Sequence, residues 1–476
     1  MDRMTRRRFI KTSVMAGAAT LSPFMKVRGA NDDIRVAVVG IRSQGANHIN
    51  WFRAIPGVRV VAICDADRAF VDREAAKFGE RNETVDTYID YRKLLEDKSI
   101  DAVIVAAPNH WHSLMGVWAC QAGKDVYIEK PVSHNIWEGR QVVKAARKYN
   151  RIVQAGTQRR SDTGLMEAFE WIRQGHLGKI KLARNIVYVE RGSIGRVNGP
   201  QKLPESVDYD LWSGPATLEP LRRRNLHYDW HWVWPTGNGD FGNNGIHFVD
   251  TCRWATGADG LARRVISIGG RLGYVDDGTT ANTQIVYLDY EEAPILCEVR
   301  GLPHAKGDPA MDNYLGTRAE TVVHCEGGYF VGGWAYDNDG EKIRQFKRTE
   351  GAGHHANFID AVRSRKPSDL HAEILDGHLS SALCHMGNIS HRLGGVAGPD
   401  EIREALSGCE PMLEAFGRME EHLALNEVDF EQTPRVLGPW LTLDGDTERF
   451  TGEFSDRANM LISRNYRAPF VVPDEV

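Results

Sequence analysis

The sequence predicts an α/β domain built on a parallel sheet, followed by an α+β domain whose sheet is open and mainly antiparallel. Strand-like and helical runs alternate over residues 33–155, whereas residues 180–331 contain strand-like runs with no regular helices between them. A chain of 476 residues is also too long for one ordinary hydrophobic core. We therefore expect domains at residues 33–155 and 156–395, with residues 396–476 as a C-terminal extension.

The composition is that of a globular protein, with 42% hydrophobic and 26% charged residues and a formal net charge of -5. The charge balance is mildly acidic, so we expect no nucleic-acid partner. The seven cysteines are scattered without zinc-type spacing, and we expect no metal site.

Residues 1–30 have the layout of an export signal, a basic stretch followed by a short apolar one. Arg6 and Arg7, with Phe9 and Lys11 at the matching offsets, indicate the twin-arginine signal of bacterial proteins that are exported folded. The apolar stretch is too short for a membrane span. We therefore expect a protein of the bacterial periplasm, or one otherwise exported by this route, without a membrane span.

The first strand, residues 33–40, ends in a glycine turn. A dinucleotide-binding turn has the pattern G-x-G-x-x-G, and Gly40 and Gly45 occupy the first and third glycine positions. Arg42 stands at the second position, after Ile41. Arg42 would lie over the nucleotide pyrophosphate as a cation or point to solvent, and the sequence does not distinguish the two.

The elements that follow support a dinucleotide-binding Rossmann domain. The second strand, residues 58–65, ends in Asp65, at the separation expected for a ribose-hydroxyl ligand. A carboxylate there favours NAD, although Arg68 nearby leaves NADP open. Helices are expected over residues 68–79 and 91–96, and a buried strand over residues 102–107.

Two later strand ends carry polar motifs. Residues 108–112 (PNHWH) follow the strand at 102–107, and Glu129-Lys130-Pro131 separates an apolar strand from a helix over residues 137–149. Ligands bind at this edge of an open parallel sheet. The candidate nucleotide contacts are therefore Gly40, Ile41, Arg42, Gly45, Asp65, Pro108, Asn109, His112, Glu129 and Lys130.

These motifs, together with residues 153–158 (VQAGTQ), resemble those of the glucose-fructose oxidoreductase and inositol dehydrogenase family (Gfo/Idh/MocA). The likeness covers residues 33–390 approximately, and the Glu-Lys-Pro motif is its most specific element. The resemblance implies NAD(P)-dependent oxidation of a secondary hydroxyl, with Lys130 reaching that hydroxyl beside the nicotinamide. It also implies a homo-oligomer, because the family often associates through the outer face of its open sheet.

Alcohol oxidation needs a cation that favours the developing alkoxide and a base that takes its proton. Lys130 can supply the cation, whereas Glu129 is better explained as an ion-pair partner. In the family an aspartate precedes a histidine by four residues, and here Asn243 precedes His247. We expect His247 to act as acid/base with Asn243 beside it, and Asp250 or Asp240 to orient neighbouring groups.

Substrate contacts are expected from two further segments. In residues 227–234 (HYDWHWVW) three tryptophans alternate, which predicts that they share one face of an extended segment suited to a sugar. Filling of the interdomain core explains any single tryptophan equally well. The candidates are Tyr228, Trp230, Trp232 and Asp250, together with His355 on a helix over residues 353–363.

Three functions follow from these expectations. The first is an NAD(P)-dependent oxidoreductase acting on a sugar, glycoside or polyol, which holds its cofactor tightly because free nucleotide is scarce outside the cytoplasm. The second is a redox-assisted glycosidase that oxidises a hydroxyl, eliminates the aglycone, adds water and returns the hydride. The third is a sugar-binding protein without turnover, suggested by Arg42 and Asn243.

Overall fold

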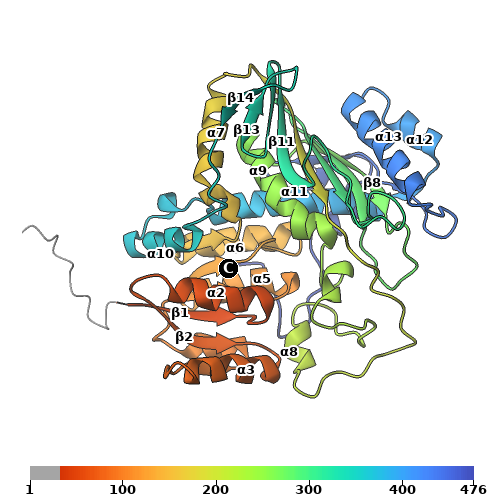
Figure 1. Cartoon of the computed structure of the whole chain (residues 1–476). Helices are drawn as coiled ribbons and strands as arrows, with labels where there is room; N and C mark the ends of the chain where they lie inside the picture. The colour runs from red at the N-terminus through yellow and green to blue at the C-terminus, as the bar shows by residue number, and fades with distance from the viewer. Residues whose placement is uncertain (1–32) are drawn as a thin grey trace, which may run out of the picture.

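Six parallel strands form the sheet of the first domain in a computed structural model that describes residues 33–476 (Figure 1). The order is β3-β2-β1-β4-β5-β6, so the direction of progression reverses between β1 and β4. Ligands bind at such a reversal, beyond the carboxyl ends of the strands. The strands are β1 (Ile34–Val39), β2 (Val58–Cys64), β3 (Asp86–Tyr88), β4 (Ala102–Val105), β5 (Asp125–Ile128) and β6 (Val153–Ala155).

Helices cover both faces of this sheet because successive strand residues point to opposite sides. Val36 and Val38 of β1 pack with α2 (Ser43–Arg53), α3 (Arg68–Gly79) and α10 (His354–Ser364). Ala37 and Val39 pack with α4 (Tyr91–Glu96), α5 (Asn109–Gln121) and α6 (Ile136–Lys148). The predicted Rossmann architecture is confirmed.

The second domain contains a twelve-stranded mixed sheet. Its main path runs β14-β13-β12-β11-β7-β10-β9-β8-β16-β15, and the central pair β7/β10 is parallel while its other pairs are antiparallel. The strands are β7 (Ile180–Tyr188), β8 (Arg264–Gly270), β9 (Thr283–Asp289), β10 (Ile295–Arg300), β11 (Ala319–Cys325), β12 (Gly328–Val331), β13 (Trp334–Tyr336), β14 (Lys342–Gln345), β15 (Gly395–Val396), β16 (Val436–Leu437), β17 (Leu441–Asp444) and β18 (Arg449–Thr451).

One face of this sheet packs on α9 (Ile246–Thr256) and α11 (Ile374–Leu393), which lie between the two sheets (Figure 1). The other face packs on α12 (Pro399–Ala405) and α13 (Glu410–Leu425). The remaining helices are α7 (Thr163–Arg173), α8 (Tyr209–Ser213) and α14 (Ser455–Asn459). No helix within residues 33–476 has the length and apolarity needed to cross a membrane.

The C-terminal extension joins both domains. β16 and β17 pair with β8 and so enlarge the second sheet. Phe470 and Val472 pack into the core of the first domain, where the ring centroid of Phe470 lies 5.4 Å from that of Trp111. Residues 396–476 therefore contribute to the hydrophobic packing of both domains.

The segment at residues 201–235, which we call the strap, crosses from β7 toward α9 along the first domain. It contains α8 and a 3₁₀ turn, Asp229–Trp232. The prediction of an extended segment with three tryptophans on one face is therefore wrong, because the turn rotates the successive side chains apart. The predicted export signal lies outside the described residues.

Candidate active site

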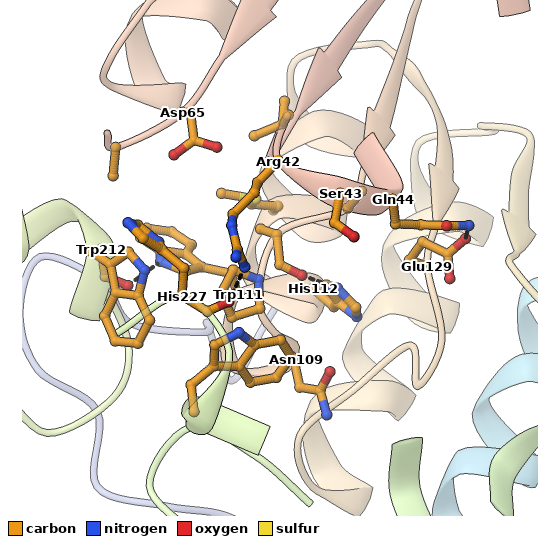
Figure 2. Close-up of a pocket in the computed structure, with 18 of the residues that line it drawn as sticks. Arg42, Ser43, Gln44, Asp65, Asn109, Trp111, His112, Glu129, Trp212 and His227 are labelled. Atoms are coloured by element: carbon orange, nitrogen blue, oxygen red, sulfur yellow. Dashed lines mark hydrogen bonds between the residues drawn. The ribbon is translucent and has the colours of Figure 1, made fainter. Parts of the chain in front are cut away.

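A cavity of about 420 Å³ lies at the carboxyl edge of the first sheet, between the strap and the beginning of α9 (Figure 2). Both domains contribute to its walls. The predicted residues that line it are Gly40, Arg42, Asp65, Pro108, Asn109, His112, Glu129, Lys130, Tyr228, Trp230, Asn243 and His247.

The two glycines shape the turn below this cavity. Gly40 has φ +77°, and a Cβ there would overlap the main chain of Ala106 and Ala107. A Cβ on Gly45 would overlap the carbonyl oxygen of Gly40, so α2 can approach the turn only with glycine at this position. Gly45 and Ile41 belong to the turn between β1 and α2 and its helix, but they do not line the cavity.

The beginning of α2 suits the pyrophosphate of a dinucleotide. The first N–H groups of a helix have no partner within the helix and favour anions. Ser43 and Gln44 line the cavity, the first turn of α2 contains no acidic residue, and no side chain caps it. Arg42 adopts an extended φ of -76°, which does not require glycine.

Asp65 forms the wall beside this helix end. Its carboxylate accepts hydrogen bonds from the main-chain N–H groups of Ile41 and Asp67, both at 3.0 Å. Burial raises the pKa of Asp65 to about 6, although these hydrogen bonds oppose the shift. A half-buried carboxylate at this wall is well suited to accept hydrogen bonds from ribose hydroxyls.

The Arg42 side chain contacts the strap, which the sequence did not predict. Its guanidinium extends across the cavity mouth and donates to the carbonyl oxygen of His227 at 2.7 Å (Figure 2). The His227 ring in turn contacts the Asp67 carboxylate at 3.0 Å. Main-chain hydrogen bonds join Arg68 to Ser206 and Asp208 to Ala66, each at 2.9 Å. The strap is thus fastened to the turn that follows β2.

Glu129 is held by residues that the sequence analysis missed. Its Oε1 contacts His48 Nε2 at 3.0 Å and accepts from the amides of Gln44 at 3.2 Å and Gln158 at 3.4 Å. Although burial opposes it, the hydrogen bond and charge of His48 hold the pKa of Glu129 well below its usual range. Gln44 and His48 are four residues apart on α2, and this spacing was the available signal.

Lys130 and Asn243 meet across the domain boundary. The Lys130 ammonium donates to the main-chain oxygen of Asn243 at 2.9 Å and to its Oδ1 at 3.3 Å. The Asn243 amide donates to Asp240 at 3.3 Å, and Asp240 forms a bidentate pair with Arg191 at 3.1 Å. Two of the three Lys130 N–H donors are therefore used, and one remains for a ligand.

Asn243 lies in a π-helical turn, Phe241–Gly245, that leads directly into α9. This turn brings both Asn243 and His247 to the cavity wall. Burial, followed by the positive charges of Lys130 and Arg159, lowers the pKa of His247 to about 3. His247 is therefore neutral at pH 7, with one ring nitrogen able to accept a hydrogen bond from a ligand hydroxyl.

The PNHWH motif, residues 108–112, forms hydrogen bonds at the floor of the cavity. The Asn109 amide donates to Asn238 Oδ1 at 3.0 Å. The His112 ring lies 2.6 Å from the carbonyl oxygens of both Ala107 and Pro131, and so links the segments that follow β4 and β5. Burial lowers the pKa of His112.

Tyr228, Trp230 and His231 come from the strap, and the His231 ring stacks on Trp230 with centroids 3.6 Å apart. Trp232 is directed away from the cavity, is 2% exposed and lies against the Arg191 guanidinium. Its assignment as a substrate contact is corrected, because it fills the core under the strap.

The assignments of Asp250 and His355 as substrate contacts are also corrected. Asp250 is fully buried, accepts from Arg160 Nε at 2.9 and 3.0 Å, and accepts from Ser380 Oγ at 2.7 Å. His355 contacts the far side of the His48 ring at 3.2 Å and stacks on Tyr127. Neither side chain lines the cavity, so both belong to the scaffold.

Replacing Asp250 with alanine is expected to lower the free energy of unfolding by about 3 kcal/mol, because the buried Arg160 would keep only the half-exposed Asp376 carboxylate, at 3.3 Å, as an ion-pair partner. Thermal denaturation measures this loss. The exposed Asp259→Ala variant is the control, with an expected change within about 0.5 kcal/mol. An Asp250 variant of normal stability with a raised KM would restore Asp250 as a substrate contact.

No group of three or more His, Cys, Asp or Glu side chains within residues 33–476 is arranged to hold a metal ion.

Comparison with known families accounts for both domains. Residues 34–157 match the model for the oxidoreductase family with an NAD-binding Rossmann fold, and residues 192–298 match the C-terminal α/β domain of the same family. The chain belongs to the Gfo/Idh/MocA oxidoreductase family. Its first domain is accordingly an NAD-binding domain.

Curated relatives of this Gfo/Idh/MocA protein include enzymes of two kinds. It is 32% identical over 122 residues to a glycosyl hydrolase family 109 protein of Shewanella sp. (strain W3-18-1). This match covers 25% of this chain and 27% of the relative. It is 34% identical over 147 residues to inositol 2-dehydrogenase 1 of Saccharopolyspora erythraea, covering 30% of this chain and 43% of the relative. The chain thus spans less than half the length of each.

Solved structures share the fold over a larger part of the chain. The WlbA dehydrogenase of Bordetella pertussis, solved with NADH and UDP-GlcNAcA, has a TM-score of 0.56 at 20% identity and covers 75% of this chain and 95% of its own. GenD2 from gentamicin A biosynthesis, solved with NAD, has a TM-score of 0.53 at 20% identity, with 76% and 95% coverage. At these identities the likeness establishes the fold.

Proposed function

We propose that this protein is an NAD-dependent oxidoreductase that acts on a secondary hydroxyl of a sugar, glycoside or polyol and holds its nucleotide tightly. The observation that carries the proposal is the convergence of Lys130, Asn243 and His247 in the cavity that begins at the glycine turn. NADP remains an alternative cofactor because Arg68 follows β2, although Asp65 disfavours a 2′-phosphate.

The residues divide the chemistry between them. The chemistry that NAD⁺ supplies when bound is acceptance of a hydride from the alcohol carbon, which leaves a ketone and one proton. The beginning of α2 and Asp65 would hold the nucleotide. The free N–H of Lys130 donates to the substrate oxygen and stabilises its developing negative charge, while neutral His247 accepts the hydroxyl proton. Tyr228, Trp230 and His231 offer aromatic faces for a sugar ring.

The first test is absorbance and mass analysis of the purified protein, before and after addition of a panel of sugars, polyols and glycosides. Bound nucleotide with a lasting reduced-nicotinamide band supports a dehydrogenase. Absence of bound nucleotide, and of binding by added NAD or NADP, would contradict the proposal and favour a sugar-binding protein.

A redox-assisted glycosidase is the second candidate, supported by the similarity to the glycosyl hydrolase family 109 protein. In such a cycle the hydride returns to the sugar, so no reduced nicotinamide accumulates. Release of an aglycone without a lasting absorbance change in the same experiment would favour this candidate.

We further propose export through the twin-arginine route, from the arrangement of Arg6 and Arg7. Fusion of residues 1–32 to a reporter tests this, and a reporter that stays cytoplasmic contradicts it. An exported enzyme needs a nucleotide that does not escape, and the fastened strap offers a means of retention.

Replacing Arg42 with glutamine is expected to accelerate nucleotide release about 10- to 100-fold, because the charged hydrogen bond that closes the cavity mouth is lost. Nucleotide content after timed dialysis measures the rate. The matched control is Arg73→Gln, since Arg73 also packs over the Phe70 ring but makes no hydrogen bond to the strap. Equal release from both variants would exclude Arg42 as the fastening.

A further inference from the structure

The His231 ring lines the cavity from the strap, and two contacts fix its orientation. One face of the ring stacks on Trp230, with the centroids 3.6 Å and the planes 21° apart. Its Nδ1 lies 2.6 Å from the carbonyl oxygen of Tyr228, three residues earlier in the chain. Rotation of the ring would break both contacts, so the direction of its remaining nitrogen, Nε2, is set by the strap.

The same contacts determine which nitrogen of His231 carries the hydrogen. A carbonyl oxygen can only accept, so Nδ1 must be the donor to Tyr228. In a neutral imidazole the lone pair is then on Nε2. Burial, followed by the positive charge of Lys130, lowers the pKa of His231 to about 3, although the hydrogen bond to Tyr228 opposes this shift. The ring is therefore neutral at pH 7, and Nε2 is a hydrogen-bond acceptor.

This acceptor is available to a ligand. Within residues 33–476 the Nε2 atom of His231 has no hydrogen-bond partner, and it is not sealed from solvent. The half-buried His231 side chain lines the same cavity as Lys130 and His247. Because the Lys130 ammonium can only donate, the cavity presents a ligand with a donor and a separate acceptor.

A hydroxyl group has one hydrogen, and this limits how a substrate can satisfy these groups. In the proposed oxidation the reacting hydroxyl accepts from Lys130 and gives its hydrogen to His247. It then has no hydrogen left for His231. The Nε2 acceptor must therefore be matched by a different donor of the substrate, and in a sugar or polyol that donor is a second hydroxyl.

From the fixed acceptor on the strap and the donor at Lys130, we infer that His231 is a specificity-determining residue that accepts a hydrogen bond from a second, unsubstituted hydroxyl of the substrate. This narrows the substrate class to sugars or polyols in which that hydroxyl is neither removed nor esterified. The inference rests on the proposed function, because that function assigns His247 to the reacting hydroxyl.

The test is calorimetric binding of sugars to the protein saturated with NADH, in which no oxidation can take place. The probes are D-glucose, D-galactose and myo-inositol, each compared with its mono-deoxy derivatives. Removal of the hydroxyl that contacts His231 should weaken wild-type binding about 10-fold. In His231→Phe, which keeps an aromatic ring on Trp230 but has no acceptor, the parent sugar should bind about 10-fold more weakly. The penalty at this one position should vanish, and the penalties at other positions should remain.

Two further variants complete the experiment. His231→Gln should restore part of the lost discrimination, because the glutamine amide oxygen can accept a hydrogen bond near the position of Nε2. The matched control is His176→Phe, since the His176 ring also stacks on a tryptophan, Trp171, at 4.8 Å, but is exposed and does not line the cavity. This control should show the wild-type pattern of binding.

If His231→Phe weakens every sugar equally and leaves all the deoxy penalties unchanged, the inference is overturned, since His231 would then have a purely structural role. Absence of binding by all three parent sugars would also overturn it. Parallel samples loaded with NAD separate this inference from the proposed function. Discrimination by His231 without reduction of the nicotinamide would contradict the oxidoreductase but leave His231 as a residue that selects the ligand.

Discussion

Replacing Lys130 with methionine is expected to lower the rate of nucleotide reduction about 10²- to 10⁴-fold while the nucleotide stays bound. Methionine keeps the length of the side chain but removes the N–H that faces the substrate and the contact with Asn243. The nucleotide would remain because the beginning of α2 and Asp65 hold it at the other end of the cavity. Stopped-flow absorbance measures the rate, and mass analysis measures the bound nucleotide.

The control for this variant is Lys144→Met, which removes an exposed ammonium from α6. It should reduce nucleotide at the wild-type rate. A Lys130 variant that is equally fast would remove Lys130 from the mechanism and leave His247 as the remaining candidate for proton transfer. Loss of nucleotide as well as rate would instead show that Lys130 is needed for cofactor binding.

Replacing Gly45 with alanine is expected to lower the free energy of unfolding by about 3 kcal/mol or more and to empty the nucleotide site. The added methyl group would overlap the carbonyl oxygen of Gly40, so α2 must move away from the turn. Thermal denaturation and the nucleotide content of the purified protein measure both effects.

Gly79→Ala is the matched control because a Cβ at this position, near the end of α3, meets no atom within 4 Å. Its stability and nucleotide content should resemble those of the wild type. A Gly45 variant that keeps its nucleotide and its unfolding temperature would show that the turn can adapt, and that the third glycine is dispensable here.

Local sequence patterns were sufficient to predict the fold of the first domain. Strands such as residues 58–65 and helices such as residues 68–79 carry their own periodicity, and the glycines and Asp65 follow at fixed distances from a strand. The helix of residues 68–79 was predicted with the bounds of α3. Placement of Lys130 and His247 in one cavity depended on the family resemblance, because no local pattern joins residues so far apart.

The failures concern contacts between distant segments. Alternation of Trp230 and Trp232 is compatible with a strand or with a short 3₁₀ turn. The structure has the turn, because Trp232 packs into the core under the strap. Asp250 and His355 carry reactive groups, but their partners, Arg160 and His48, come from remote parts of the chain. Arg42 was unassignable for the same reason, since its acceptor at His227 lies 185 residues away.

The packing of Phe470 and Val472 into the first domain has a consequence for how the protein folds. The core around Trp111 is incomplete until these residues reach it, more than 300 positions later in the chain. The second sheet also depends on residues 396–476, because β16 and β17 pair with β8. Unfolding should therefore be a single cooperative event in which neither domain melts alone, and during synthesis the nucleotide-binding half should remain immature until almost the whole polypeptide has left the ribosome.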